Sequence, residues 1–457
     1  MKKKLTLKEV RNIFVELEKK YSVYSLESNN VYYWKLIRKE IYDYIIMKLG
    51  FVEKAHPMST VDKVRRFLFL LKYSTINLFK KNNVKQSDVL ILTHGRKNKI
   101  NDSYEDIYLY DILRQLEKNN SSYFIIDRPD HYGKHLGKER NNMIYFERFG
   151  HIVREILYPF FIHRIKLTET RNIIIEVEKE IKERLNIDID LEGLIKKRIF
   201  RFILEKRYFD KLLDKIRPDK VIMVVSYGKE ELIASAKERD IETIEVQHGV
   251  ISSYHMGYHF PFEFPIPYFP DEIILFGDYW KESVCFPVNS RQTINSFSFM
   301  KHSYNNRVIS ENKMNKVLFV SQGSIGVHLS KIAANFAYEN QIDCYYKLHP
   351  SEFNNWRNRY SELSKCEIDG RIKVISNQNS IYELFNLCKY VIGVYSTAIY
   401  ESLMYGCKTF VVKIEGYQYM EFLIDKNYVK LLSTDFCLND LYDFQENKLE
   451  NKRYFYA

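Results

Sequence analysis

Residues 380–412, SIYELFNLCKYVIGVYSTAIYESLMYGCKTFVV, alternate helical and extended patterns. Ser380 and Glu383 have the spacing of a capping box, which predicts the start of a helix. One apolar face of that helix is formed by Ile381, Leu384, Phe385 and Cys388. The strand YVIGVYS, the helix TAIYESLMYG and the strand KTFVVKI follow. Because such alternation joins parallel strands, the stretch predicts part of a doubly wound α/β domain.

The alternation begins upstream of this stretch. KVLFV, DCYYKLHP and IKVIS read as strands, and VHLSKIAANFAYENQ reads as a helix after the first of them. The sequence therefore predicts a second Rossmann-like domain at residues 301–440, with 441–457 as a tail. Residues 286–312 are polar and weakly patterned, and we interpret them as the connection between domains.

The first half of the chain predicts another domain of the same type, at residues 84–300. Its expected strands are 89–92, 123–126, 221–225, 243–246 and 272–276, and helical patterns lie between them. Residues 1–83 have mostly helical spacing and predict an N-terminal helical extension. The fold class expected is α/β, with two doubly wound domains facing a cleft.

Composition narrows the class of protein. The chain has 457 residues, 46% hydrophobic and 28% charged, as in a folded protein of more than one unit. The six cysteines lie in the second half without a CxxC spacing, so a metal knuckle or a disulfide framework is not expected. The N-terminus lacks the apolar core of a signal peptide, which favours a cytoplasmic protein.

The formal net charge of +11 calls for an anionic partner. Nucleic acid is not expected, because neither an RNP-type aromatic motif nor a recognition helix with clustered arginines is found. No run reaches the roughly 18 apolar residues of a spanning helix. Residues 61–81, VDKVRRFLFLLKYSTINLFKK, surround an apolar cluster with basic residues. This pattern is typical of a helix on the inner, anionic face of the cell membrane, or of a core-packing helix with solvated ends.

Polar residues follow the strands of the predicted second domain, at the edge where doubly wound sheets bind ligands. Ser321, Gly323 and Ser324 form a loop that can wrap a phosphate, although turns after strands are often rich in Ser and Gly. His349 and Pro350 follow the next strand; the histidine can donate to an anionic oxygen or cap its own loop.

The last strand of this series is followed by hydroxyl and acidic side chains. Ser396 and Thr397 either cap the following helix or share its N-terminus with a phosphate. Glu401 lies one turn further, where it can accept hydrogen bonds from ribose hydroxyls or be solvated. The combination within one domain predicts a nucleotide site.

KLHPSE and residues 380–412 resemble the donor half of bacterial GT-B glycosyltransferases that build surface polysaccharides. The chain is similar to those with HP and Ser/Thr motifs, including CMP-sialic acid and Kdo transferases and, more distantly, CDP-glycerol polymerases. EVQHG and FGDYW resemble capsule-synthesis proteins of this group. The resemblance covers about residues 84–430. It implies that His349 contacts the donor phosphate and nucleotide, that Ser396 and Thr397 hold the phosphate, and that Glu401 approaches the ribose.

An inverting transferase needs a base for the acceptor hydroxyl. The acidic pair followed by glycine that the sialyltransferases carry is not found, so the base is sought after strands of the first domain. We choose Asp102 in the polar loop 93–106 as the base, although an acidic residue there can also simply begin the next helix. His248, in a Gln-His-Gly turn, is the second catalytic candidate; it can bind the acceptor or the leaving phosphate, or lock the domain junction. Arg96, Gln247 and Gly249 are the predicted acceptor-binding residues. No metal ligand set and no cofactor are expected.

The function predicted is therefore metal-independent transfer of a sugar from a CMP- or UDP-type nucleotide sugar to a lipid-linked or growing capsule, O-antigen or lipooligosaccharide chain. Glycerophosphate transfer from a CDP donor is a close alternative. An enzyme like UDP-GlcNAc 2-epimerase has the same two-domain shape, but VQHG stands where that family carries an acidic loop. A non-catalytic polysaccharide assembly partner is the remaining alternative.

Overall fold

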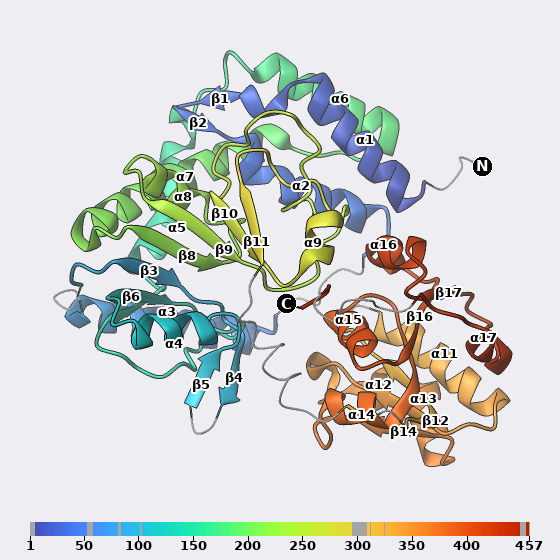
Figure 1. Cartoon of the computed structure of the whole chain (residues 1–457). Helices are drawn as coiled ribbons and strands as arrows, with labels where there is room; N and C mark the ends of the chain where they lie inside the picture. The colour runs from blue at the N-terminus through green and yellow to red at the C-terminus, as the bar shows by residue number, and fades with distance from the viewer. Residues whose placement is uncertain are drawn as a thin grey trace.

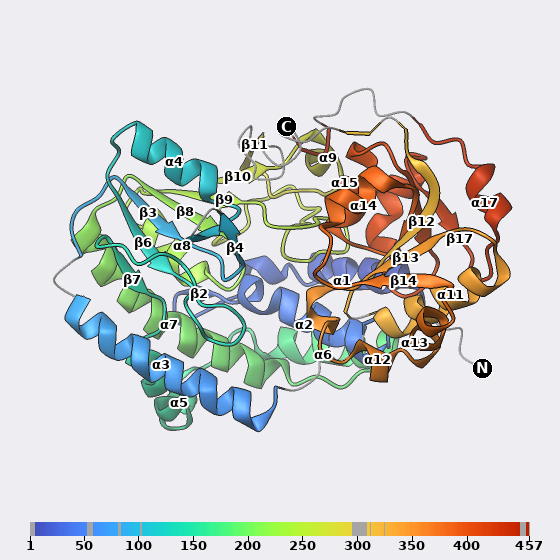
Figure 2. The ribbon, with the colours of Figure 1, turned by 90° about the horizontal axis from the view of Figure 1, so that it is seen from below.

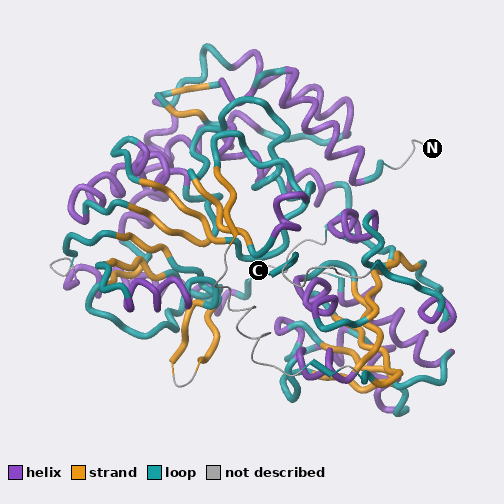
Figure 3. Tube along the Cα trace, in the orientation of Figure 1, coloured by secondary structure: helices purple, strands orange, loops and turns teal. Residues whose placement is uncertain are grey.

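The computed structural model describes residues 5–52, 58–80, 84–100, 103–294, 309–310, 312–323, 325–447 and 454–456. In this part of the chain two parallel sheets are each covered by helices (Figures 1 and 3). We call the unit around the first sheet the first lobe and the unit around the second sheet the second lobe.

The first lobe has a seven-stranded sheet in the order β11-β10-β9-β8-β3-β6-β7, in which all neighbours are parallel. The strands are β3 (Val89–Leu92), β6 (Tyr123–Asp127), β7 (Met143–Tyr145), β8 (Lys220–Val224), β9 (Glu242–Val246), β10 (Glu272–Leu275) and β11 (Arg291–Ile294). The helices around it are α3 (Thr60–Lys80), α4 (Tyr110–Lys118), α5 (Phe149–Phe161), α7 (Leu191–Ile216), α8 (Glu230–Lys237) and α9 (Asp278–Glu282). Central strands such as β3 are apolar throughout because helices bury both faces of the sheet.

The second lobe has a six-stranded parallel sheet in the order β14-β13-β12-β15-β16-β17. The strands are β12 (Met314–Val320), β13 (Cys344–Lys347), β14 (Ile372–Ile375), β15 (Cys388–Gly393), β16 (Lys408–Val412) and β17 (Lys430–Leu432). The helices are α11 (Gly326–Glu339), α12 (Trp356–Arg359), α13 (Ser361–Ile368), α14 (Ile381–Leu387), α15 (Thr397–Met404), α16 (Glu421–Asp425) and α17 (Leu438–Tyr442). Ser380 caps α14 by accepting a hydrogen bond from the N–H of Glu383, as the capping box predicts.

Strand order fixes where a ligand binds. When the strands of each sheet are counted along the chain, both sheets read 3-2-1-4-5-6, and the first adds a seventh strand next to the sixth. The order reverses between β3 and β8 and between β12 and β15, and doubly wound sheets bind ligands beyond the carboxyl ends of strands at such points. The predicted fold class, two doubly wound domains in the GT-B arrangement, is confirmed.

The N-terminal helices α1 (Leu7–Lys20) and α2 (Trp34–Lys48) pack against α6 (Arg171–Leu185) and α7, with the short strands β1 (Glu27–Ser28) and β2 (Val31–Tyr32) beside them (Figure 1). Arg38 of α2 is buried and pairs with Glu18 of α1 at 2.7 Å. The same guanidinium donates to the carbonyl oxygen of His259 at 2.8 Å. These helices therefore hold the loop that follows β9.

Helix α3 lies beside the edge strand β7 and beside α5 (Figure 2). The side-chain amide of Asn77 donates to the carbonyl oxygens of Tyr145 and Glu147 at 2.8 and 2.7 Å. Tyr73 and Ser74 are buried, whereas the apolar residues on the opposite face are exposed. One face of α3 therefore packs in the first lobe, as a core-packing helix would, and the other face is exposed. None of the described helices is long and apolar enough to cross a membrane.

Two segments differ from the predictions. Residues 291–294 lie in the segment interpreted as a connection, yet they form β11, which pairs with β10. As an edge strand with a partner on one side only, β11 tolerates the polar sequence RQTI. The predicted loop 93–106 contains an antiparallel hairpin of β4 (Lys97–Ile100) and β5 (Ser103–Asp106). Neither strand joins a main sheet, so the hairpin needs no buried apolar residues, and its polar sequence does not predict strands.

The segment 454–456, predicted as part of a tail, returns to the first lobe. The backbone N–H of Tyr279 donates to the carbonyl oxygen of Tyr454 at 2.9 Å, and the indole of Trp280 donates to that of Phe455 at 2.8 Å. Tyr400 of α15 packs on Trp280 with ring centroids 4.6 Å apart. We call Tyr279, Trp280, Tyr400 and Phe455 the aromatic joint, because they connect the two lobes.

Candidate functional site

A cavity of about 500 Å³ lies between the lobes at the carboxyl ends of both sheets. We call it the cleft cavity. It brings together eight of the predicted site residues: Arg96, His248, Ser321, His349, Pro350, Ser396, Thr397 and Glu401. Gln247, Gly249 and Gly323 do not line it, and Asp102 and Ser324 lie outside the described residues.

His349 lines the cleft cavity directly after β13. Its Nδ1 accepts a hydrogen bond from the backbone N–H of Ser351, and the backbone N–H of His349 donates to the Glu352 carboxylate at 2.6 Å, so that Pro350–Glu352 form a capped 3₁₀ turn. Burial lowers the pKa of His349, which favours the neutral ring. Because Nδ1 accepts, the neutral ring carries its proton on Nε2. The histidine both caps its loop and keeps an N–H available for an anionic oxygen.

The serine and glycine loop after β12 is held by the second lobe itself. Ser321 is buried; its hydroxyl donates to Glu352 at 2.9 Å and accepts from Tyr346 at 3.0 Å. Gly323 faces the His349 loop, because a Cβ there would lie 2.5 Å from the Ser351 hydroxyl. This loop thus packs closely against the turn that positions His349.

The N-terminus of α15 points at the cavity wall. Ser396 accepts a hydrogen bond from the N–H of Ala398 at 3.2 Å. It therefore caps α15, which is the first of the two roles predicted for it. Glu401 is buried one turn further, and burial raises its pKa to about 7, although Arg96 across the cleft opposes the shift. At neutral pH Glu401 is therefore present in both protonation states, and it can donate to or accept from a ligand hydroxyl.

The β4–β5 hairpin of the first lobe supplies the opposite wall. Arg96 and Asn98 line the cleft cavity, and the Arg96 guanidinium donates to the Tyr108 hydroxyl at 3.3 Å. Lys97 is not available for an acceptor, because its ammonium pairs with the buried carboxylate of Asp127. Arg96, directly before the hairpin, is thus the cation that this segment presents to the cleft cavity.

His248 follows β9 and lines the cleft cavity. Its Nδ1 and Nε2 lie 3.4 Å from the hydroxyls of Tyr258 and Tyr227. Tyr258 donates its hydroxyl hydrogen to the buried Glu245, which leaves the tyrosine oxygen to accept the Nδ1–H of His248. Burial, then Arg128, lowers the pKa of His248 to about 4. The ring is therefore neutral at pH 7, with an unprotonated Nε2.

The neighbours of His248 shape its turn. Gln247 is fully buried, donates to the carbonyl oxygen of Gly249 at 2.8 Å and accepts from the N–H of Phe276 at 2.8 Å. No atom lies within 4 Å of a Cβ built on Gly249, so the glycine leaves open space there. Gln247, predicted to bind the acceptor, holds the loop in this structure.

The residues that line the cleft cavity without having been predicted include Tyr456, Tyr382 and Lys347. Tyr456 comes from the returning segment and is buried, and its hydroxyl has no hydrogen-bond partner among the described residues. Tyr382 of α14 and Lys347 of β13 complete that side. Lys347 could have been found from the sequence KLHP, since it ends a strand, but Tyr456 depends on a chain reversal that no local pattern encodes.

A second cavity, of about 520 Å³, lies in the first lobe and shares Arg96 with the cleft cavity. We call it the first-lobe cavity. Its walls come from α3, from the loops after β3 and β6, and from the start of α5. His94 belongs to this wall; its Nδ1 accepts from the N–H of Arg96 at 3.0 Å, and burial lowers its pKa to about 3. His94 and His248 therefore carry their protons on opposite nitrogens.

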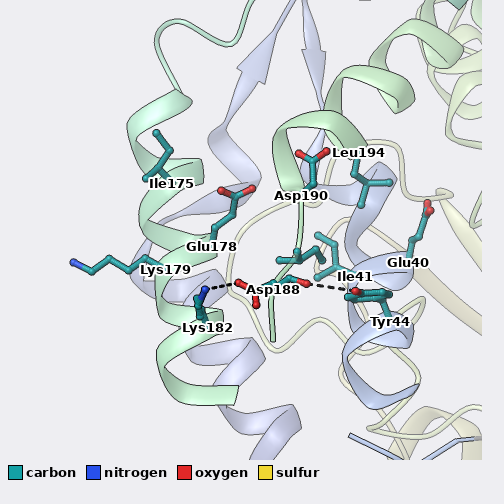
Figure 4. A pocket seen from close by; sticks show the side chains of 11 residues that line it. Glu40, Ile41, Tyr44, Ile175, Glu178, Lys179, Lys182, Asp188, Asp190 and Leu194 are labelled. Atoms are coloured by element: carbon teal, nitrogen blue, oxygen red, sulfur yellow. Dashed lines mark hydrogen bonds and ion pairs between the residues drawn. The ribbon is translucent and has the colours of Figure 1, made fainter. Parts of the chain in front are cut away.

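Another hollow, of about 820 Å³, lies away from both cavities, between α2, α6 and α7 (Figure 4). Its polar groups bond to one another: Lys182 pairs with Asp188 at 2.6 Å, and Glu178 accepts from the N–H of Leu191 at 2.7 Å. Asp190 caps α7. These side chains join helices, so we assign the hollow a structural role. Across the described ranges no three or more His, Cys, Asp or Glu side chains gather as a metal site.

A comparison with protein-family models finds no match, and a comparison with curated proteins finds none either. Similar solved structures include nucleotide-sugar epimerases and glycosyltransferases. UDP-GlcNAc 2-epimerase from Methanocaldococcus jannaschii has 12% identity and a TM-score of 0.41, covering 80% of this chain and 93% of its own. MurG from Acinetobacter baumannii has 10% identity and a TM-score of 0.38, covering 77% and 88%. HepE from Anabaena, in complex with UDP and glucose, has 10% identity and a TM-score of 0.39, covering 76% and 86%.

Proposed function

We propose that this protein is an inverting, metal-independent glycosyltransferase that moves a sugar from a nucleotide sugar to a lipid-linked or growing surface polysaccharide. The observation that carries the proposal is the pair of adjoining cavities that share Arg96. Transfer between two substrates needs two sites that meet at the reacting atoms, whereas an epimerase binds one nucleotide sugar. The cleft cavity takes the donor and the first-lobe cavity takes the acceptor.

The proposed chemistry is one displacement at the anomeric carbon. The acceptor oxygen forms a bond to that carbon as the bond to the donor phosphate breaks, and Nε2 of His248 takes the proton of the acceptor hydroxyl. The Nε2–H of His349 and the N-terminus of α15 stabilise the negative charge that develops on the leaving phosphate. Glu401 is placed to bond the ribose hydroxyls.

Donor binding is tested by thermal shift with CMP, CDP, UDP, GDP, their sugars and CDP-glycerol. We expect one nucleotide to raise the Tm, since ligand at about 100 Kd adds about 2.7 kcal/mol to stability. His349→Ala removes the N–H that meets the phosphate and is expected to abolish most of the shift. His328→Ala, at an exposed position on α11, is the control and should behave like the wild type.

The outcomes of this screen separate the alternatives. A shift with CDP-glycerol but with no nucleotide sugar would favour glycerophosphate transfer. Conversion of a UDP-sugar without any acceptor would replace the proposal with an epimerase. If no nucleotide binds, or if His349→Ala responds like the wild type, the donor site is not the cleft cavity.

We further propose that the protein docks on the inner face of the cell membrane through α3 and α5. Each helix exposes an apolar stripe at i, i+3, i+7 spacing: Val61, Val64 and Leu68 on α3, and Val153, Ile156 and Phe160 on α5. Phe67 is 50% and Leu68 58% exposed. The exposed cations around the stripes, which suit anionic headgroups, are Lys63, Arg65, Lys72 and Arg164.

Deleting α3 would not test this idea, because Asn77 and the buried face of α3 hold β7. The double variant Phe67→Glu, Leu68→Glu keeps that face. Burial of each side chain is worth about 1.5–3 kcal/mol, so we expect at least about tenfold weaker binding to vesicles with anionic lipid in a co-sedimentation assay. Met314→Glu, an exposed apolar position on the second lobe, is the control. Equal binding by both variants would contradict the proposal.

A further inference from the structure

The first-lobe cavity collects cations from three separate elements. Arg66 comes from α3, Arg96 follows β3, and Arg128 follows β6. The backbone N–H of Arg128 donates to the Thr93 hydroxyl at 2.9 Å, which fixes this residue at the edge of the sheet. Like charges that line one hollow repel each other, and an anion bound between them would offset that repulsion.

Arg128 lines the cavity, and Lys229 lies behind its wall. In the part of the chain that the structure describes, neither the Arg128 guanidinium nor the Lys229 ammonium makes a hydrogen bond or ion pair. Lys229 is only 6% exposed, and its Nζ lies 4.4 Å from the ring centre of Phe146, which lines the cavity. Burial, and next the nearby Arg128, lower the pKa of Lys229 well below its ordinary value. The positive charge of Arg128 thus disfavours the protonated amine, and an anion bound in the cavity would offset this repulsion.

The carboxylates near this wall are already bonded. Glu147 pairs with Nε2 of His135. Asp130 accepts from the backbone N–H groups of Tyr132 and Lys134 at 2.9 Å. Among the residues that line the cavity, the three arginines outnumber these two carboxylates, which leaves an excess of positive charge.

The histidines of the wall supply neutral donors. Because Nδ1 of His94 accepts from Arg96, its Nε2 carries a hydrogen. Nε2 of His151 lies 3.0 Å from the Arg148 guanidinium, which can only donate, so Nδ1 of His151 carries the hydrogen. Burial lowers the pKa of each ring to about 3, so both are neutral at pH 7. Guanidinium forks and single N–H donors together suit an oxyanion with several oxygens.

The cavity also borders the surface that we propose to contact the membrane. Arg66 lies on α3 beside Phe67, and a Cβ on Gly133 would lie 3.1 Å from Cγ of Arg66, so the loop of Gly133 closes the cavity against this helix. We infer that the first-lobe cavity binds the phosphate or diphosphate through which the acceptor glycan is joined to its lipid. This inference rests on the proposed function, because it identifies the acceptor by the chemistry of its linkage.

The test is calorimetric binding of inorganic pyrophosphate to the whole protein, with and without a saturating donor nucleotide. We expect pyrophosphate to bind in both conditions, and Arg128→Gln and Arg66→Gln each to weaken binding at least tenfold. Arg66 lies on an exposed helix face, so Arg66→Gln keeps the test valid if Arg128→Gln folds poorly. Arg207→Gln, at an exposed position on α7, is the matched control and should bind like the wild type.

The remaining outcomes separate this inference from the proposed function. Absence of pyrophosphate binding, unchanged binding by both variants, or loss of binding in His349→Ala would overturn the inference, while nucleotide binding by the wild type would leave the proposed function in place. Vesicles of phosphatidic acid distinguish a membrane headgroup from the acceptor. If these vesicles compete with pyrophosphate, the cavity binds membrane lipid headgroups, and the inference is overturned as well.

Discussion

Replacing His248 with alanine is expected to slow sugar transfer by a factor of about 10² to 10⁴, the range for loss of a general base. Donor binding should stay unchanged, because the phosphate site that we propose, at His349 and the N-terminus of α15, lies on the other lobe. The expected signature is a fall in kcat without a rise in the KM for the donor. Steady-state kinetics with the donor that the thermal-shift screen identifies would measure it, and His328→Ala serves again as the control.

The pH profile adds an independent readout. Since the pKa of His248 is lowered to about 4, the base is unprotonated across the neutral range. We expect kcat/KM to be insensitive to this group near pH 7 and to fall as the pH drops through about 4. Tyr258→Phe removes the hydroxyl that orients the ring and should lower kcat less than His248→Ala does. Full activity of His248→Ala would rule out this base and return attention to Asp102.

Replacing His135 with alanine is expected to destabilise the first lobe by about 3–5 kcal/mol, the usual effect of removing one member of a buried charge network. Nδ1 of His135 lies 2.6 Å from Asp127, and Nε2 pairs with Glu147. Without the ring, Asp127 keeps Lys97 as its cation, whereas Glu147 loses the ion pair that the described residues give it. Chemical denaturation would measure the change in the free energy of unfolding, with His163→Ala, at an exposed position, as the control.

The pH dependence of this loss has a definite sign. Burial disfavours the charged ring, but hydrogen bonds to Asp127 and Glu147 outweigh burial and raise the pKa of His135. A group whose pKa is raised by folding contributes stability below its unfolded value of about 6.5 and loses it as the pH rises through the folded value. The difference between wild type and His135→Gln should therefore shrink at alkaline pH. An equal difference at pH 6 and at strongly alkaline pH would mean that the ring is neutral when folded.

Central strands were predictable because burial on both faces forces an unbroken apolar run, as in VLIL of β3 and FVV of β16. The strands β7, β11 and β17 were not predicted. They are three or four residues long and lie toward the edges of their sheets, where a short or polar run is tolerated. The hairpin β4–β5 was also missed, because it forms a separate two-stranded sheet and requires no apolar pattern.

The candidate site divides along similar lines. His349, Ser396 and His248 directly follow strands, so the position of the strand end predicts that of the side chain. The significance of Arg128 depends on what tertiary packing brings around its guanidinium, for which the described residues offer no hydrogen-bond or ion-pair partner. Gln247 also follows a strand, yet it is buried, because the direction of a side chain in a loop depends on contacts made far along the chain.

The returning segment 454–456 joins the cavity to the contact between the lobes. Phe455 packs in the aromatic joint, while the adjacent Tyr456 lines the cleft cavity. A rotation of one lobe must therefore displace part of the wall that a donor touches. Ligand affinity and lobe orientation are thermodynamically linked, and a donor shifts the population of orientations by its difference in affinity among them.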